Sequence, residues 1–172
     1  KLINLRTEIM IKFRIGNGYD VHALAEGESL ILGGIRIEHT KGTIAHSDGD
    51  VVIHSLCDAL LGALALGDIG KHFPDNDPTF KNIDSTILLK KVMDMIREHN
   101  YELSNADITI AMQRPKLAPY ITSMRERIAQ IMGVKISDIS IKATTTEKLG
   151  FVGREDGVEV FSSVLLHESA RI

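Results

Sequence analysis

The chain has 172 residues and a formal net charge of −3, with 44% hydrophobic and 25% charged residues. This composition is typical of a globular protein with one core, and the small negative charge gives no basis for a nucleic-acid partner, which needs a basic face. The single cysteine excludes an internal disulfide framework, and no apolar run reaches the length of a membrane span.

The first nine residues precede Met10 and carry neither the apolar stretch of a signal peptide nor the composition of a transit peptide. We expect residues 1–9 to be a leftover of expression or a frayed extension. One domain is then expected over residues 10–168, without internal repeats or linkers.

The first predicted element is a strand. Ile11, Phe13 and Ile15 alternate with charged residues, which predicts a half-buried strand that leads into a segment containing Asp20 and His22. Side chains two apart on a strand share one face, so these two can hold the same ion. The alternative for Asp20 is an ordinary turn residue.

The next elements are a hairpin and an apolar helix. Residues 30–37 are apolar around Gly33 and Gly34, which predicts a hairpin or a bulged strand. Ser47 followed by Asp50 resembles a capping box ahead of a helix that stops near Gly67.

That helix carries the third candidate metal ligand, His54, in its first turns. A helical histidine beside an apolar stripe is more often structural, but the Asp-x-His pattern brings a metal site to about even odds. Two histidines and one carboxylate leave a fourth position open, as in catalytic zinc sites. His46 and Ser47, at the expected helix start, would suit a phosphate, although Ser47 alternatively only caps the helix.

The second half alternates helices and strands. A polar loop over residues 68–78, a lid or plain loop, precedes a helix over 84–99 with Ile87, Val92 and Ile96 inward. A strand around Ile108, a helix closed by Gly133, and strands over 139–145 and 158–166 follow. We therefore expect an α/β (α+β) fold, with one mixed sheet covered by helices.

Two further segments carry candidate phosphate contacts. Thr144, Thr145 and Glu147 lie at a strand end, where the carboxylate would need a hard cation such as Mg²⁺ beside phosphates. Lys116 lies in a proline-flanked loop, and either contacts phosphate or is a surface lysine.

Several motifs occur together in a fixed order: D-V-H, A-H-S-D-G-D, A-L-G-D-I-G, F-P-D-x-D and K-A-T-T-T-E-K-L-G-F-x-G-R. On these motifs the chain resembles the 2-C-methyl-D-erythritol 2,4-cyclodiphosphate synthase family from about Arg14 to Leu166. The resemblance implies a homotrimer with sites between subunits, in a bacterial cytoplasm or otherwise a plastid stroma. It implies closure of 4-diphosphocytidyl-2-C-methyl-D-erythritol 2-phosphate into the cyclic diphosphate, with loss of CMP, in the methylerythritol pathway.

The resemblance also assigns residues to roles. Zinc, one per subunit, would be held by Asp20, His22 and His54, and Mg²⁺ or Mn²⁺ by Glu147. His46 and Thr145 would stabilise the transition state. The remaining substrate contacts implied are Ser47, Asp68, Ile69, Gly70, Phe73, Asp75, Asp77, Met112, Lys116, Ala118, Thr144, Phe151 and Arg154.

One position departs from the family pattern. Family members often carry Glu at the position of Asp156, at the mouth of an apolar channel along the trimer axis. An isoprenoid phosphate in that channel is therefore left open. Two other functions also stay open: a zinc phosphohydrolase with Asp48 as the candidate base, and a non-enzymatic module that binds nucleotides or isoprenoid phosphates.

Overall fold

A computed structural model describes residues 11–74, 77 and 83–169. The predicted extension over residues 1–9 and the candidate contact Asp75 lie outside this part of the chain. The described ranges contain seven strands: β1 (Phe13–Glu26), β2 (Leu30–Leu32), β3 (Ile35–Ile37), β4 (Lys41–Thr43), β5 (Tyr101–Ala111), β6 (Ile139–Thr144) and β7 (Gly157–Glu168). The longer helices are α1 (Val51–Ala63), α3 (Ser85–Glu98) and α4 (Ile121–Met132), and the short ones are α2 (Ile69–His72), α5 (Gly150–Gly153), η2 (Ala118–Tyr120) and η3 (Ile136–Asp138).

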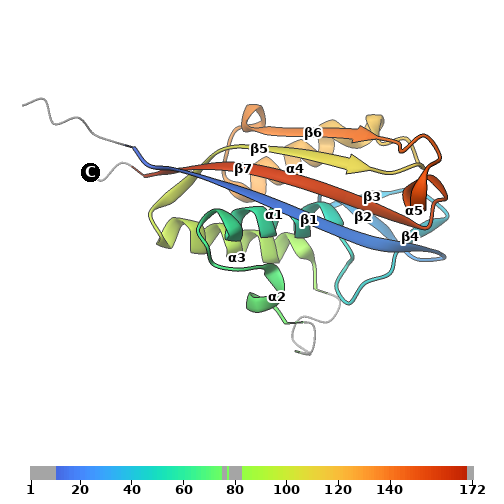
Figure 1. Ribbon diagram of the computed structural model, residues 1–172, viewed down its shortest axis with the longest axis horizontal. Coiled ribbons are helices and arrows are strands. Elements are labelled where there is room, and N and C mark those ends of the chain that lie inside the picture. Colours follow the sequence, from blue (N-terminus) through green and yellow to red (C-terminus); the bar gives the residue numbers. More distant parts are fainter. Residues whose placement is uncertain (1–10, 75–76, 78–82, 170–172) are drawn as a thin grey trace, which may run out of the picture.

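The expected mixed sheet is confirmed, with the strand order β4-β1-β7-β5-β6 (Figure 1). Neighbouring strands are antiparallel except β5 and β6, which run parallel. The β2–β3 pair forms a separate hairpin, as predicted, because Gly33 and Gly34 adopt the left-handed conformation in its turn. The central pair joins β1 to β7, so the two ends of the domain lie side by side in the sheet.

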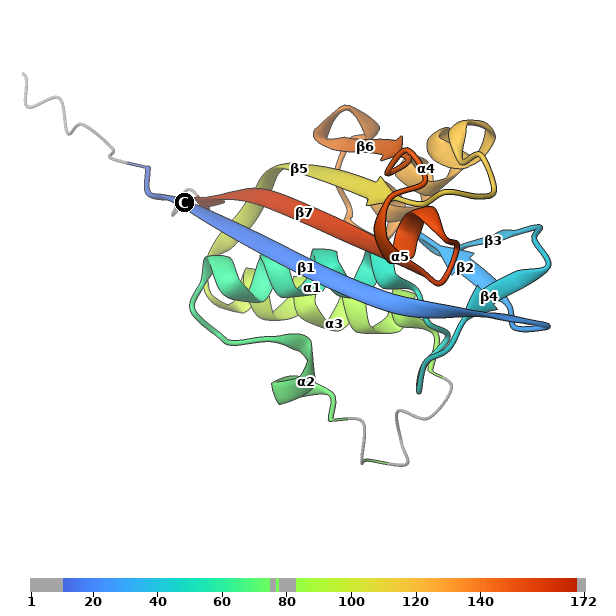
Figure 2. The ribbon, with the colours of Figure 1, turned by 45° about the vertical axis from the view of Figure 1, so that its right-hand side comes forward.

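Helices α1, α3 and α4 cover one face of the sheet, and α2 lies apart from it on a loop (Figure 2). The buried side chains form one core; Leu56, Leu60, Ile96, Ile108 and Met124 are inaccessible to solvent. Burying each such side chain stabilises the fold by about 1.5–3 kcal/mol. No helix in the described ranges is both long and apolar enough to cross a bilayer.

Two predictions about the helices were wrong in part. Ile87 is exposed, whereas Leu88 and Leu89 are buried on α3 together with Val92 and Ile96, which were predicted to face inward. Helix α1 ends at Ala63, before the predicted stop near Gly67.

The largest discrepancy concerns the start of β1. Ile11, Phe13 and Ile15 are 52%, 59% and 71% exposed, so the apolar side of the predicted strand faces away from the helices. The side that faces the helices carries Gly16 and Gly18.

Candidate metal centre and adjoining cavities

The glycine face of β1 determines how closely helix α1 approaches the sheet. A Cβ atom at Gly16 would lie 1.9 Å from the carbonyl oxygen of Ala59, and one at Gly18 would lie 1.9 Å from that of Ser55. These contacts are backbone against backbone, so only glycine permits them. The close approach brings the first turn of α1, with His54, over the next two residues on the same face, Asp20 and His22.

The three side chains meet as the sequence predicted that they could. Asp20 Oδ2 lies 3.0 Å from His22 Nε2 and 3.2 Å from His54 Nδ1, and the two histidine nitrogens are 3.2 Å apart. Zinc–nitrogen bonds of about 2.0–2.1 Å in a tetrahedron place neighbouring ligand atoms about 3.3 Å apart. The donor set and its spacing therefore suit a metal ion, and Asp20, His22 and His54 are the only such group in the described part of the chain.

The cluster also shifts its own protonation. Burial alone would raise the pKa of Asp20, but hydrogen bonds from His22 and His54 outweigh burial and lower that pKa well below its usual range. Burial would lower the pKa of His22, yet the neighbouring Asp20 carboxylate raises it. Without a metal, the ionised Asp20 carboxylate therefore favours the protonated form of His22.

His54 makes a second set of contacts through its other ring nitrogen. Nε2 lies 2.9 Å from Ser85 Oγ and 3.2 Å from Ser47 Oγ. Ser85 in turn bonds to Asp48 through both its backbone N–H and its hydroxyl. Asp48, the base candidate of the hydrolase alternative, is therefore directed at the start of α3 and does not line the adjoining cavity.

The start of α1 differs from the prediction that Ser47 opens a capping box there. Asp50 is the N-cap, and its buried carboxylate accepts hydrogen bonds from Val52 and Ile53 and from the hairpin glycines Gly33 and Gly34. Burial raises the pKa of Asp50 to about 6, while the backbone N–H groups oppose that shift. Because Asp50 already occupies the helix terminus, a bound anion there would rest on His46, Ser47 and the loop instead of the helix N–H groups.

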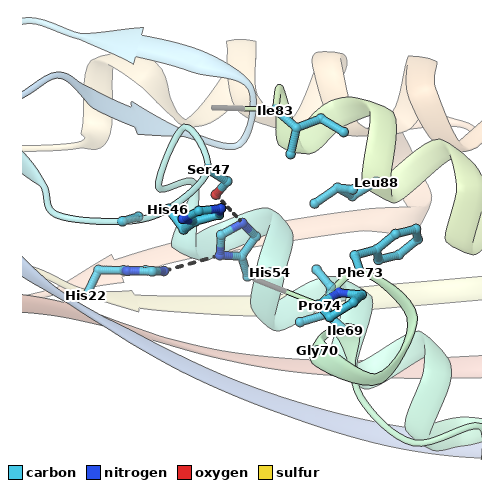
Figure 3. A pocket seen from close by; sticks show the side chains of 11 residues that line it. His22, His46, Ser47, His54, Ile69, Gly70, Phe73, Pro74, Ile83 and Leu88 are labelled. Carbon is cyan, nitrogen blue, oxygen red and sulfur yellow. Dashed lines mark hydrogen bonds between the residues drawn. The ribbon is translucent and has the colours of Figure 1, made fainter. Parts of the chain in front are cut away.

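A cavity of about 470 Å³ opens beside the metal cluster (Figure 3). His22, His46, Ser47 and His54 line one side, and the α2 segment lines the other. Ile69 and Gly70 of α2 line it together with Phe73 and Pro74, which follow that helix, and Ile83 and Leu88 complete the wall.

Two carboxylates, Asp58 and Asp68, hold the α2 segment in place through hydrogen bonds. Asp68 caps α2 by accepting a hydrogen bond from Lys71 N, and it does not line the cavity. Asp58 of α1 accepts a hydrogen bond of 2.7 Å from Ile69 N. The backbone N–H of Asp77 donates a hydrogen bond of 3.1 Å to the carbonyl oxygen of Pro74.

A second cavity, of about 240 Å³, lies at the ends of β5 and β6. Its lining holds five of the predicted substrate contacts: Met112, Lys116, Ala118, Thr144 and Thr145. No residue lines both cavities. Within one chain, His46 and Thr145 therefore face separate spaces.

The last three predicted contacts lie after β6, outside both linings. Glu147 is in the left-handed conformation and accepts a hydrogen bond of 3.0 Å from Thr145 Oγ1. Phe151 lies on α5 and is 36% exposed. Arg154 forms an ion pair of 2.9 Å with Asp156.

Several residues of the site were missed by the sequence analysis. Ser85 follows Asp84 in an ordinary helix-capping pattern, and nothing in that pattern indicates a contact with His54. Asp58 stands one helical turn after His54, a spacing that would have placed it on the same side of α1.

Comparisons with known proteins agree on one family. The YgbB family model matches residues 13–167. A 2-C-methyl-D-erythritol 2,4-cyclodiphosphate synthase of Ectopseudomonas mendocina is 60% identical over 153 residues, covering 89% of this chain and 98% of the relative. The synthase of the same name from Bacillus mycoides is 58% identical over 156 residues, covering 91% and 99%.

Solved structures give the same result. The bifunctional IspDF of Campylobacter jejuni superposes with a TM-score of 0.89 at 48% identity, over 92% of this chain and 43% of that longer one. The IspF of Plasmodium falciparum in complex with CDP has a TM-score of 0.81 at 36% identity, covering 92% and 97%.

Proposed function

Because this chain belongs to the YgbB family, we propose that it is a 2-C-methyl-D-erythritol 2,4-cyclodiphosphate synthase: it converts 4-diphosphocytidyl-2-C-methyl-D-erythritol 2-phosphate to the cyclic diphosphate and CMP. The observation that carries this proposal is the Asp20–His22–His54 group, which stands at the edge of the 470 Å³ cavity. A zinc ion held by these three residues would have one position left open toward the cavity. When bound, it supplies positive charge that offsets the charge of the substrate phosphates.

The residues around the first cavity would bind the methylerythritol part and its phosphates. His46 and Ser47 offer donors to phosphate from the loop before α1. Ile69, Gly70 and Phe73 would face the carbon skeleton, and Asp68 would hold the shape of α2.

The second cavity would bind the cytidine part. Met112, Lys116 and Ala118 surround a pocket that suits a flat base, and Lys116 and Thr144 would reach its phosphates. Two structural neighbours are described as bound to CDP, which supports a cytidine nucleotide as the ligand class. Glu147, joined to Thr145, would hold Mg²⁺ or Mn²⁺ against the diphosphate, and Phe151 and Arg154 would border this region.

A complete site needs both cavities, and one chain keeps them apart. The sheet face opposite the helices carries Ile15, Tyr19, Val21 and Phe161, all at least 43% exposed. Contiguous apolar exposure of this kind marks a protein interface. We therefore propose a homotrimer in which the first cavity of one chain adjoins the second cavity of its neighbour, so that His46 and Thr145 act on one substrate.

The reaction would be ring closure by the substrate itself. An oxygen of the 2-phosphate attacks the β-phosphorus of the diphosphate, the bond from that phosphorus to the bridging oxygen breaks, and CMP leaves with the electron pair. No serine or cysteine nucleophile is required, and Cys57 is buried in the core. The chain contributes by holding two mutually repelling phosphates at reacting distance and by stabilising charge with His46 and Thr145.

Ring closure is favoured over hydrolysis by this arrangement. Two groups held at reacting distance have an effective molarity of about 10⁵ M or more, against roughly 55 M for water. The zinc phosphohydrolase alternative needs a base beside the metal, and Asp48 is engaged with Ser85 instead.

Supplying the cytidylylated substrate in ¹⁸O-labelled water tests this proposal. We expect CMP and a cyclic diphosphate that both lack solvent oxygen. Solvent ¹⁸O in either product would move the assignment to a hydrolase, and the absence of any CMP would leave a binding module.

A further inference from the structure

The environment of His54 Nε2 suggests how this ligand is prepared for its metal. This inference rests on the metal site of the proposed function. His54 uses Nδ1 toward Asp20 and His22, at 3.2 Å from each. A neutral imidazole carries one proton on its two ring nitrogens. Nδ1 can therefore offer a lone pair to a metal only when that proton is on Nε2.

The hydrogen-bond directions around Ser85 place that proton on Nε2. Ser85 is completely buried at the first turn of α3, and its backbone N–H donates to Asp48 Oδ2 at 3.0 Å. Its hydroxyl donates a hydrogen bond to Asp48 Oδ1. A carboxylate can only accept, so the hydroxyl hydrogen of Ser85 is directed at Asp48. The oxygen of Ser85 is then left as the acceptor for His54 Nε2–H, 2.9 Å away.

We propose that Asp48 and Ser85 are positioning residues for the metal: they fix both the tautomer and the ring orientation of His54, so that Nδ1 presents its lone pair to the ion. Neither residue lines the cavity, so neither touches substrate there. Partners of this kind behind a metal-binding histidine typically contribute 10- to 100-fold to metal affinity.

Ser47 provides a contrast at the same nitrogen. Its hydroxyl is farther from His54 Nε2, at 3.2 Å, and also accepts a hydrogen bond from Gly49 N. Within the part of the chain that the structure describes, no carboxylate accepts the hydroxyl hydrogen of Ser47, and Ser47 lines the cavity. That hydrogen is free to point toward a phosphate, so Ser47 should matter for substrate and little for the metal.

The test is a Zn²⁺ titration of metal-stripped protein against a competing chelator, with Zn²⁺ as the only ligand. Ser85→Ala should weaken Zn²⁺ binding 10- to 100-fold. Asp48→Asn should act similarly, because both carboxylate oxygens accept hydrogen bonds and an amide must break one of them. Ser47→Ala is the matched control and should stay within threefold of the unmodified protein.

A second readout reports on the proton itself. In zinc-loaded protein labelled with ¹⁵N-histidine, the Nε2–H of His54 should exchange slowly with water and should keep doing so in Ser47→Ala. Ser85→Ala should accelerate that exchange. The measurement on the unmodified protein requires no variant, so it decides the tautomer even if Ser85→Ala does not fold.

Three results would overturn the inference: Zn²⁺ affinity unchanged in Ser85→Ala and Asp48→Asn, equal loss in Ser47→Ala, or a His54 that coordinates through Nε2. Failure of the proposed metal site itself looks different. In that case the unmodified protein would not bind Zn²⁺, or would bind it equally well in His22→Ala.

Discussion

The two faces of β1 are built from opposite kinds of residue. One face places Gly16 and Gly18 against α1 and then presents Asp20 and His22 to His54. The other face carries Phe13, Ile15, Tyr19 and Val21, all exposed in the single chain.

The difference teaches that the buried face of this strand is the one with glycines, where a helix can pack closely. The face with the larger apolar side chains is the exposed one. The face with no side chain at two positions lets a helix come close, and that closeness is what assembles a metal-binding group. The apolar face is left exposed in the single chain.

The largest effect is expected where the glycine face is altered. Gly18→Ala would drive a Cβ atom to 1.9 Å from the carbonyl of Ser55, so α1 must separate from the sheet. We expect the free energy of unfolding to fall by more than about 4 kcal/mol, with little folded protein by circular dichroism. Gly62→Ala is the control: its Cβ would lie 3.8 Å from the nearest atom, and the exposed helix should gain about 0.5–1 kcal/mol. A folded Gly18→Ala with normal metal binding would disprove the close-approach account.

The next effect concerns the ligands that the glycine face positions. His54→Ala should leave two of three ligands and lower Zn²⁺ affinity by roughly 10³-fold, which corresponds to about 4 kcal/mol. Elemental analysis after gel filtration should find about one zinc per chain in the unmodified protein and none in the variant. Stoichiometric zinc in both His54→Ala and His22→Ala would show that these residues are not the zinc ligands. Another metal in the unmodified protein would change the identity of the bound ion.

Charging the apolar face should separate the subunits without unfolding them. The Phe161 ring packs at a tilt against Tyr19, with ring centroids 4.9 Å apart, and Phe161 is 49% exposed, so Phe161→Lys costs little within one chain but would bury a charge in a trimer. Light scattering should give a trimer for the unmodified protein and a monomer for Phe161→Lys. Lys90→Glu, on the exposed side of α3, should remain trimeric. A monomeric unmodified protein at micromolar concentration would contradict the shared site.

The smallest expected effect is a pH dependence of metal binding. Asp20 raises the pKa of His22 above its ordinary 6.5, so more of His22 is protonated near pH 7, and the proton must leave before the nitrogen can coordinate. Zn²⁺ affinity should therefore rise as pH increases through and above 6.5, by up to about tenfold per pH unit, and level off once His22 is neutral. Competition titrations at several pH values measure this; an affinity that is flat across that window would show that His22 carries no extra proton.

The same pair also stabilises the metal-free fold in a defined pH range. The raised pKa of His22 contributes stability that is fully present below 6.5 and is lost as pH rises through the folded value. The lowered pKa of Asp20 contributes stability that is present above 3.8 and is lost as pH falls below it. Thermal melting of metal-stripped protein should therefore be highest between these limits.

Much of this architecture was predictable from local pattern, and the exceptions have a physical reason. The hairpin at Gly33–Gly34, the start of α3 near Asp84 and the Gly133 end of α4 depend on nearby residues, so the sequence predicted them. The Asp20–His22–His54 meeting was predictable because spacing on a strand and position on a helix are local as well. The inward face of β1 was not predictable, because an alternation of apolar residues does not distinguish a core face from a face that packs against another chain. Nor was Ser85, whose contact with His54 depends on how α3 packs against α1.

The pairing of β1 with β7 has a consequence for the order of folding. Residues 13–23 pair with residues 157–167, so the strand that carries Asp20 and His22 finds its main neighbour only in the last part of the chain. Contacts this distant in sequence form late and slow the folding rate, because a long loop must close first. During synthesis, the segment of α1 with His54 is made well before β7, the strand that pairs with β1 and so fixes the positions of Asp20 and His22. The metal-binding group is therefore assembled by the final strand, and a chain interrupted before β7 would hold the ligand residues without the geometry that unites them.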